Sequence, residues 1–210
     1  MQQTIDTFKL NIESVKQLDI IYQYLEQENI KNLDLSEILR AEIVLAVSAL
    51  DHFISDILHI GLVKTFEEEK PLTTAFSKFQ VDMKTLVKIV NEPSQKEKSL
   101  ILGEYIRKFN EGNSYQKPSN IANSLKLLGV NELWNKLSGP LSIKNPDEIQ
   151  KELENIVTQR HKIAHEADFD HLTQKKRPRD KITTFQAVQF IERLCIAIHE
   201  IVSNELETLD

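Results

Sequence analysis

The chain has 210 residues, 40% hydrophobic and 28% charged, so it can bury the core of one domain or at most two and is not a disordered polymer. Its formal net charge of −6 excludes a uniformly basic surface, so any site for nucleic acid must be a local basic patch. The single cysteine, Cys195, excludes an internal disulfide framework, and its apolar neighbours predict a buried side chain. With only five glycines and six prolines, turn formers are scarce, which predicts long helices with few connections.

The first residues carry no sign of a secretory leader. The segment MQQTIDTFKLN lacks the basic start and the apolar block of a signal peptide. The longest apolar stretches are interrupted by charged residues within about ten positions, which is too short for a transmembrane helix. We therefore expect a cytoplasmic protein with no membrane partner.

Apolar residues at three- and four-residue spacing predict helices throughout the first half of the chain. The second of these follows a capping box formed by Asp34 and Glu37. Its middle, EIVLAVSALDHFISDILHIGLV, is apolar on most sides, so we expect it to be the most buried helix. The helices predicted in this half cover residues 7–27, 35–68, 76–91 and 97–109.

The second half begins with the polar segment NEGNSYQKPSN and continues with two short helices predicted over residues 120–129 and 131–139. Asn145 as a cap, Pro146 at the first helical position and Glu148 two residues later then predict the start of a longer helix.

A polar loop over residues 168–181 is predicted after this helix, and a last helix is predicted to begin at Thr184. No stretch shows sustained strand alternation or an internal repeat. We therefore expect an all-α, single-domain helical bundle of about seven to eight helices over residues 1–210. A helical insertion at about 70–145 is the part expected to stand apart from the rest.

The segment IVTQRHKIAHEADFD, residues 156–170, carries an unusual group of charges at the end of the longer helix. On a wheel of about 100° per residue, Arg160 falls on the apolar stripe, where a guanidinium must find a partner, water or an anion. His161 and His165 are four residues apart and share a neighbouring face. Arg160 and His165 are about 140° apart, so a regular helix does not aim both at one point.

Three interpretations of this segment are open. In the first, Arg160 caps carbonyls at the helix end and the histidines only place positive charge near the helix C-terminus. In the second, His161 and His165 bind zinc with Asp168 or His171 as a third ligand, although Lys162 stands where the metalloprotease motif has glutamate. In the third, the segment handles phosphate, with arginine as the anion clamp and histidine as the proton-transfer group.

An arginine, a polar residue and, after a short gap, a histidine near the end of a helix in an all-α domain resemble the signature of the HEPN superfamily. Here polar His161 follows Arg160, and four residues separate Arg160 from His165. The string RHKIAHEADFD is similar to the motif of the RiboL-PSP and MAE_28990-type HEPN groups. LAVSALDHFISDIL and KPSNIANSLKLLGVNELW also resemble segments of these groups, so the resemblance covers most of the chain.

The resemblance implies a metal-independent endoribonuclease that needs no cofactor, with Arg160 and His165 as catalytic residues. It gives a supporting role to an acidic residue of the early apolar helix, Asp51 or Asp56. By their chemistry, His161 can orient His165 or bond a phosphate, and Asp168 or Glu166 can hold a histidine tautomer. The resemblance also implies RNA as the partner and a homodimer in which two motif helices meet. Many HEPN nucleases are toxins or phage-defence effectors, which a separate antitoxin or regulator would control. Because some members are inactive, a silent module that binds RNA, nucleotide or a partner protein is the alternative.

The chemistry is consistent with these residue types. RNA supplies its own nucleophile, the 2′-hydroxyl, and a histidine can accept that proton while a second, protonated histidine donates to the leaving 5′-oxygen. Arg160 would neutralise charge on the phosphorane oxygens. The expected products are a 2′,3′-cyclic phosphate and a 5′-hydroxyl, and DNA should not react.

The loop after the motif carries five cations in an otherwise acidic chain. They attract a phosphate backbone in one interpretation, and in the other they are a solvated loop that only balances charge. The predicted RNA-binding residues are Lys175, Lys176, Arg177 and Arg179, with Lys181 close by.

Overall fold

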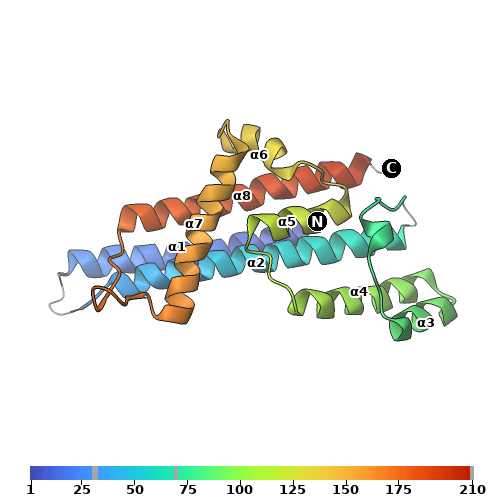
Figure 1. Cartoon of the computed structure of the whole chain (residues 1–210), viewed down its shortest axis with the longest axis horizontal. Helices are drawn as coiled ribbons and strands as arrows, with labels where there is room; N and C mark the ends of the chain where they lie inside the picture. The colour runs from blue at the N-terminus through green and yellow to red at the C-terminus, as the bar shows by residue number, and fades with distance from the viewer. Residues whose placement is uncertain (30–32, 69–70, 209–210) are drawn as a thin grey trace.

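A computed structural model describes residues 1–29, 33–68 and 71–208 of the chain. Helices α1, α2 and α8 lie side by side along the long axis, α7 crosses them, and α3 and α4 lie beside one end of α2 (Figure 1). The elements are α1 (Gln2–Gln27), α2 (Ser36–Glu67), the 3-10 helix η1 (Phe76–Lys78), α3 (Met83–Asn91), α4 (Gln95–Glu111), α5 (Pro118–Leu125), the 3-10 helix η2 (Lys126–Leu128), α6 (Leu133–Leu141), α7 (Pro146–Glu166), β1 (Phe169–Asp170), β2 (Lys175–Lys176) and α8 (Lys181–Thr208).

Helix α2 is the centre of the core, as its apolar sequence predicts. Its apolar side chains are buried beneath α1, α4, α7 and α8, and Phe53 packs against Phe8 of α1 with ring centroids 5.2 Å apart. Cys195 of α8 is fully buried in the same core, and burial raises the pKa of its thiol. The prediction of an all-α helical bundle is confirmed.

The structure divides one predicted helix in two. Residues 76–91 were expected to be continuous, but η1 ends at Lys78 and α3 begins only at Met83. The break arises because the Asp82 carboxylate accepts a 2.8 Å hydrogen bond from the Thr85 backbone N–H and caps α3. Helix α7 starts where predicted, because the Asn145 side chain accepts a hydrogen bond from the Asp147 N–H at 3.0 Å.

The predicted polar loop contains a small antiparallel hairpin. Strands β1 and β2 pair Phe169 with Lys176 and Asp170 with Lys175. Helix α8 begins at Lys181, one turn before the predicted start at Thr184, because the Asp180 carbonyl and carboxylate accept hydrogen bonds from the first turn.

One helix of the described residues, α2, is long and apolar enough to cross a membrane, contrary to the expectation that no stretch would be. Half of its most apolar window is buried inside the protein, as in the core helix of a globular protein. Length and composition alone therefore do not assign this helix to a membrane.

The region predicted to stand apart is only partly separate from the core, because α4 packs against α2 and buries Leu102 and Ile106 there. Helix α3 has no buried residue and lies against α4, whereas α5 and α6 contribute Ile121, Leu125, Leu133 and Leu137 to the main core. We call residues 71–117 the α3–α4 lobe. The extent of a separate domain stays a prediction.

Helix α2 also buries a carboxylate that the core does not satisfy. Glu42 is 2% exposed, and its Oε1 atom has no hydrogen-bond partner among the described residues. Burial, aided by the negative charge of Asp19, raises the pKa of Glu42 to about 7, while Lys181 opposes the shift. The folded protein therefore holds this proton at a pH where the unfolded chain has released it.

We predict that Glu42→Gln stabilises the protein in a pH-dependent manner. Between about pH 4.5 and 7 the wild-type free energy of unfolding falls as pH rises, because the unfolded chain ionises Glu42 more readily. The variant lacks this loss, so at pH 8 it should be more stable by about 2 kcal/mol, and at pH 4.5 the difference should vanish. Urea unfolding at both pH values measures this, with Glu13→Gln on the exposed face of α1 as control. Equal changes at both pH values would contradict it.

Candidate functional site

Helix α7 presents Arg160 and the two motif histidines to different surroundings. Ile149, Leu153 and Ile156 are buried against the core, and Arg160 follows on the same stripe, half-buried. The Arg160 Nε atom is buried and has no hydrogen-bond partner among the described residues. The Nε–H group therefore lacks a partner while the surrounding structure covers it from solvent.

The motif histidines lie on the exposed side of α7. The rings of His161 and His165 lie against each other at a centroid distance of 4.6 Å, with their planes tilted by 42°. Both side chains are exposed, and within the described part of the chain neither makes a hydrogen bond to Arg160. The structure thus pairs the two histidines with each other and leaves Arg160 on the neighbouring, core-facing stripe.

The end of α7 is fixed by two successive residues with left-handed backbone conformation. Ala167 has φ 49° and Asp168 has φ 56°. The backbone N–H groups of both residues donate to the carbonyl oxygen of Lys162, the Asp168 bond being 2.9 Å long. This closure turns the chain sharply and directs the Asp168 side chain towards α2.

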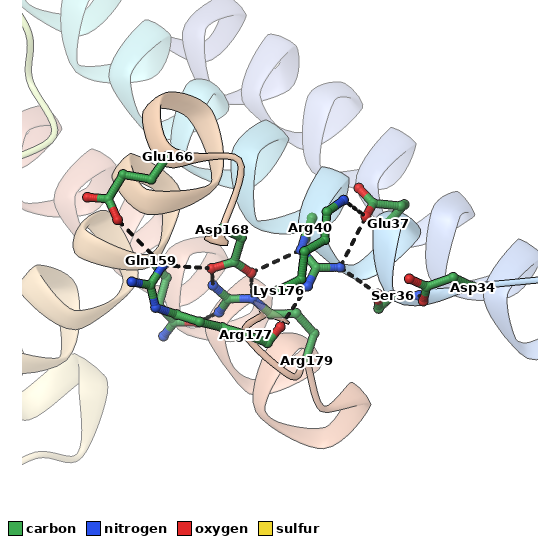
Figure 2. Close-up of polar contacts among 10 residues, drawn as sticks. All are labelled: Asp34, Ser36, Glu37, Arg40, Gln159, Glu166, Asp168, Lys176, Arg177 and Arg179. Carbon is green, nitrogen blue, oxygen red and sulfur yellow. Dashed lines mark hydrogen bonds and ion pairs between the residues drawn. The ribbon is translucent and has the colours of Figure 1, made fainter. Parts of the chain in front are cut away.

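Asp168 is fully buried and forms the centre of an ion cluster that we call the Asp168 clasp (Figure 2). Arg179 donates two hydrogen bonds to its carboxylate, Nε–Oδ2 at 2.7 Å and Nη2–Oδ1 at 2.6 Å. Arg40 of α2 donates from Nε to Oδ2 at 2.9 Å, and its Nη2 atom donates to the Arg177 carbonyl at 2.7 Å. The clasp joins α2, the end of α7 and the segment before α8.

The electrostatics of the clasp favour the ionised carboxylate. Burial by itself would raise the pKa of Asp168, but the hydrogen bonds and positive charges of Arg179 and Arg40 outweigh burial and hold the pKa below its ordinary value. Asp168 was predicted to support catalysis. It lies at the foot of the motif helix, where it can act by positioning that helix.

Most cations of the loop are paired with acidic groups of the same chain. Lys176 contacts Glu37 of α2, Arg177 lies 3.4 Å from Glu166, and Lys181 lies 3.4 Å from Glu26. Together with Arg179 in the clasp, four of the five cations have partners, and among the described contacts only Lys175 has none. The RNA-binding role of Lys175, Lys176, Arg177 and Arg179 stays a prediction.

The acidic candidates on α2 bind other groups. The Asp51 carboxylate accepts from the backbone N–H of Tyr115 at 2.5 Å and from the Gln116 side chain at 2.8 Å, so it holds the connection between α4 and α5. Asp56 lies 3.4 Å from His52 Nε2. Neither carboxylate bonds to the motif histidines in the described structure, and the supporting role of Asp51 stays a prediction.

The third ligands proposed for a zinc site are also committed elsewhere. Asp168 is held by arginines, and the His171 ring packs edge-on to Phe169 at 6.0 Å. Within the described residues no group of three histidine, cysteine, aspartate or glutamate side chains converges on one point.

Sequence reasoning did not identify Arg40, which is 3% exposed and reaches Asp168 across 128 positions of the chain. A signal was present, because Arg40 and Glu42 interrupt the most apolar helix, and a buried charge requires a partner. The identity of that partner follows only from the tertiary structure.

We predict that Asp168→Asn destabilises the protein by about 3 kcal/mol or more at pH 7, because two buried arginines lose their counter-charge. The ionised carboxylate stabilises the folded state above its unfolded-state pKa, so the difference from wild type should shrink as pH falls below about 4. Urea unfolding at pH 7 and pH 3.5 measures it. Asp6→Asn, at an exposed position of α1, is the control, and equal losses in the two variants would contradict the role of the clasp.

The comparisons with known proteins identify a family. A family model described as RiboL-PSP-HEPN matches residues 9–204, nearly the whole chain. No curated protein and no solved structure matches the chain. Because the match covers well over half of the sequence, the chain belongs to the RiboL-PSP-HEPN family.

Proposed function

We propose that the protein is a metal-independent endoribonuclease that uses Arg160 and His165. The observation that carries this proposal is the exposed histidine pair on α7 of a HEPN-family chain, beside a guanidinium whose Nε atom has no partner in the described structure. Two groups able to move protons and one group able to hold an anion are the minimum that phosphodiester transesterification requires.

The proposed reaction begins when one histidine accepts the proton of the RNA 2′-hydroxyl. The oxygen attacks the adjacent phosphorus, and a protonated histidine donates to the 5′-oxygen as the P–O bond breaks. Arg160 stabilises the extra negative charge on the phosphorane oxygens. The products are a 2′,3′-cyclic phosphate and a 5′-hydroxyl, and His161, which lies against His165, orients its neighbour.

The proposed active form is a homodimer. Arg160 lies on the core-facing stripe of α7, and the histidines lie on its exposed side, so one chain presents them in different directions. A two-fold pairing of α7 helices would bring Arg160 of one chain towards His165 of the other. We propose that such a nuclease acts in the cytoplasm as a toxin or phage-defence effector under a separate antitoxin or regulator.

We predict cleavage of RNA in excess chelator, with loss of activity in two variants. His165→Ala should lower kcat by about 10²–10⁴, because a proton-transfer group is lost. Arg160→Ala should lower it by about 10²–10³, because transition-state charge is left unbalanced. Denaturing gels measure the rates, and phosphatase and kinase treatment identifies the product ends.

The matched control is His171→Ala, an exposed histidine outside the motif helix. It should cleave like wild type, and a DNA strand of the same sequence should remain intact. Wild-type protein that cuts no RNA, or motif variants that cut as fast as the control, would refute the nuclease.

We also predict that a mixture of two inactive variants regains activity. In a heterodimer of Arg160→Ala and His165→Ala chains, one composite site has both catalytic groups and the other has neither. An equal mixture should therefore recover about a quarter of wild-type activity after subunit exchange. Sites built within one chain would recover nothing, and sedimentation of each variant checks that dimers form.

The second candidate is a catalytically inactive module that binds RNA, nucleotide or a partner protein. The partial burial of Arg160 favours it, because a buried guanidinium contacts substrate only if side chains rearrange. Tight RNA binding without cleavage, and without toxicity on expression, would favour this module over the nuclease.

A further inference from the structure

The α3–α4 lobe carries positive charge on an acidic protein. Residues 71–117 contain eight lysines and arginines against five acidic residues, a formal net charge of +3, while the rest of the chain has 18 basic and 27 acidic residues, or −9. In Figure 1 the helices of this lobe lie apart from α7 and α8, beside the opposite end of α2 from the Asp168 clasp. A polyanion is therefore attracted to the lobe more than to the remaining surface.

A groove between α3 and α4 concentrates this charge. Lys84 and Lys88 stand on successive turns of α3, and Lys108 faces them from α4. The three side chains are exposed, and none has an ion pair or hydrogen bond in the described part of the structure. Of the two acidic residues in the groove, Glu104 and Asp82, the second is engaged in capping α3.

The lobe differs in this respect from the basic loop before α8. There four of the five cations are already paired with acidic groups of the same chain. A phosphate that binds such a cation must first displace a carboxylate, whereas the groove lysines form no ion pair in the described structure, although Asp82 interacts electrostatically with Lys84. The groove is therefore the stronger phosphate site of the two.

Aromatic rings stand beside the groove lysines. Tyr105 and Phe109 line the groove from α4, and Phe109 remains 39% exposed. Phe79 packs edge-on behind both, with its ring centroid 5.3 Å from that of Phe109 and 6.3 Å from that of Tyr105. The Phe109 ring is thus fixed from behind and open in front, the arrangement that stacks an unpaired base.

The hollow continues from this ring towards α2. Phe109 also lines a second hollow with Gln80, Asn120 and Asn123. The Asn120 Nδ2 atom donates to the Ser114 carbonyl at 2.8 Å, so the amides of Gln80 and Asn123 are the ones that can hydrogen-bond to base edges. That hollow shares Asn113 and Tyr115 with a third, which reaches Ser48, Asp51 and His52 on α2. The floor is held in place because Asp51 binds the backbone N–H of Tyr115 and the Tyr115 hydroxyl donates to Asn110 at 2.6 Å.

We propose that this run of hollows, from Lys84, Lys88 and Lys108 past Phe109 to Asp51, is a binding track for single-stranded RNA. Lysines hold the phosphates, Phe109 stacks a base, and the amides contact base edges. Duplex RNA binds more weakly, because its bases are paired and cannot stack on Phe109. That the strand is RNA rests on the proposed function, whereas the location of the track rests on the lobe itself.

The test measures binding in a chain that carries His165→Ala, so that cleavage does not interfere. A fluorescent 12-nucleotide RNA is titrated at several salt concentrations, and anisotropy gives the affinity. The triple variant Lys84→Gln, Lys88→Gln and Lys108→Gln should weaken RNA binding at least roughly tenfold. The slope of the logarithm of the binding constant against the logarithm of the salt concentration should become shallower by about two. The charge-matched control, Lys9→Gln, Lys144→Gln and Lys151→Gln, should bind like the parent.

A second pair of variants tests stacking without removing charge. Phe109→Leu keeps an apolar side chain against Phe79 but loses the flat ring, so affinity should fall by roughly fivefold or more. Phe109→Tyr should retain affinity. Thermal unfolding of each variant verifies that the fold is intact, and a loss confined to Phe109→Leu in folded protein supports the track.

Several results would overturn the proposal. The first is an equal loss of RNA affinity in the two triple-lysine variants, and the second is a larger loss on substituting Lys175 and Lys176 than on substituting the groove lysines. Duplex RNA that binds as tightly as single-stranded RNA, or no RNA binding at all, would also overturn it. The proposed function can fail separately from the track. If the parent chain binds RNA through the lobe but wild type cuts no RNA, the track is supported and the nuclease is refuted. If wild type cleaves RNA while the groove variants bind RNA as tightly as the parent, the nuclease is retained and the track is lost.

Discussion

The buried carboxylate of Asp168 is the constraint on which the arrangement around α7 depends. A charge without solvent is costly, and the protein offsets that cost with two arginines from distant parts of the sequence, Arg40 on α2 and Arg179 before α8. Ala167 and Asp168 both have left-handed backbone conformation, and α7 ends at Glu166, two residues before Asp168. The ion cluster thus joins the end of the motif helix to α2 and to the segment before the last helix.

The same cluster changes how the surface charge should be interpreted. By sequence, the cations from Lys175 to Lys181 form the most basic segment of the chain, yet their charge is largely balanced by Glu26, Glu37, Glu166 and Asp168. Their contribution to the fold is to attach the hairpin segment to α2 and α7, and the start of α8 to α1. In the α3–α4 lobe the groove lysines Lys84, Lys88 and Lys108 form no ion pair in the described structure. These cations are therefore more available to a ligand, although they are less densely clustered in the sequence.

Features that depend on local sequence were predictable. The Asn145 cap, the burial of α2 and the all-α fold follow from spacing, capping and composition. The hairpin was missed because two-residue strands are too short to show alternation, and residues 76–91 were joined because the Asp82 cap lies inside an apolar stripe. The partner of Arg40 lies 128 positions away, and no periodicity encodes a contact at that distance. The motif itself was readable because its residues are close in sequence, and the helical wheel also placed Arg160 on the apolar stripe and the histidines on a neighbouring face, as the structure has them.

The direction of those side chains limits how a nuclease can be assembled from this chain. Arg160 and His165 would converge within one protomer only if the last turn of α7 were distorted or if Arg160 left its stripe. The first route is opposed by the regular helix through Glu166, by the closure onto the Lys162 carbonyl and by the Asp168 clasp that follows. The second route costs the apolar packing of a half-buried side chain. A second chain removes the need to distort α7, because each protomer supplies the group that the other lacks, and Arg160 then has only to move its side chain towards the partner. Because the Asp168 clasp holds α7 rigid, a catalytic site shared between two protomers is assembled more readily than a site within one protomer.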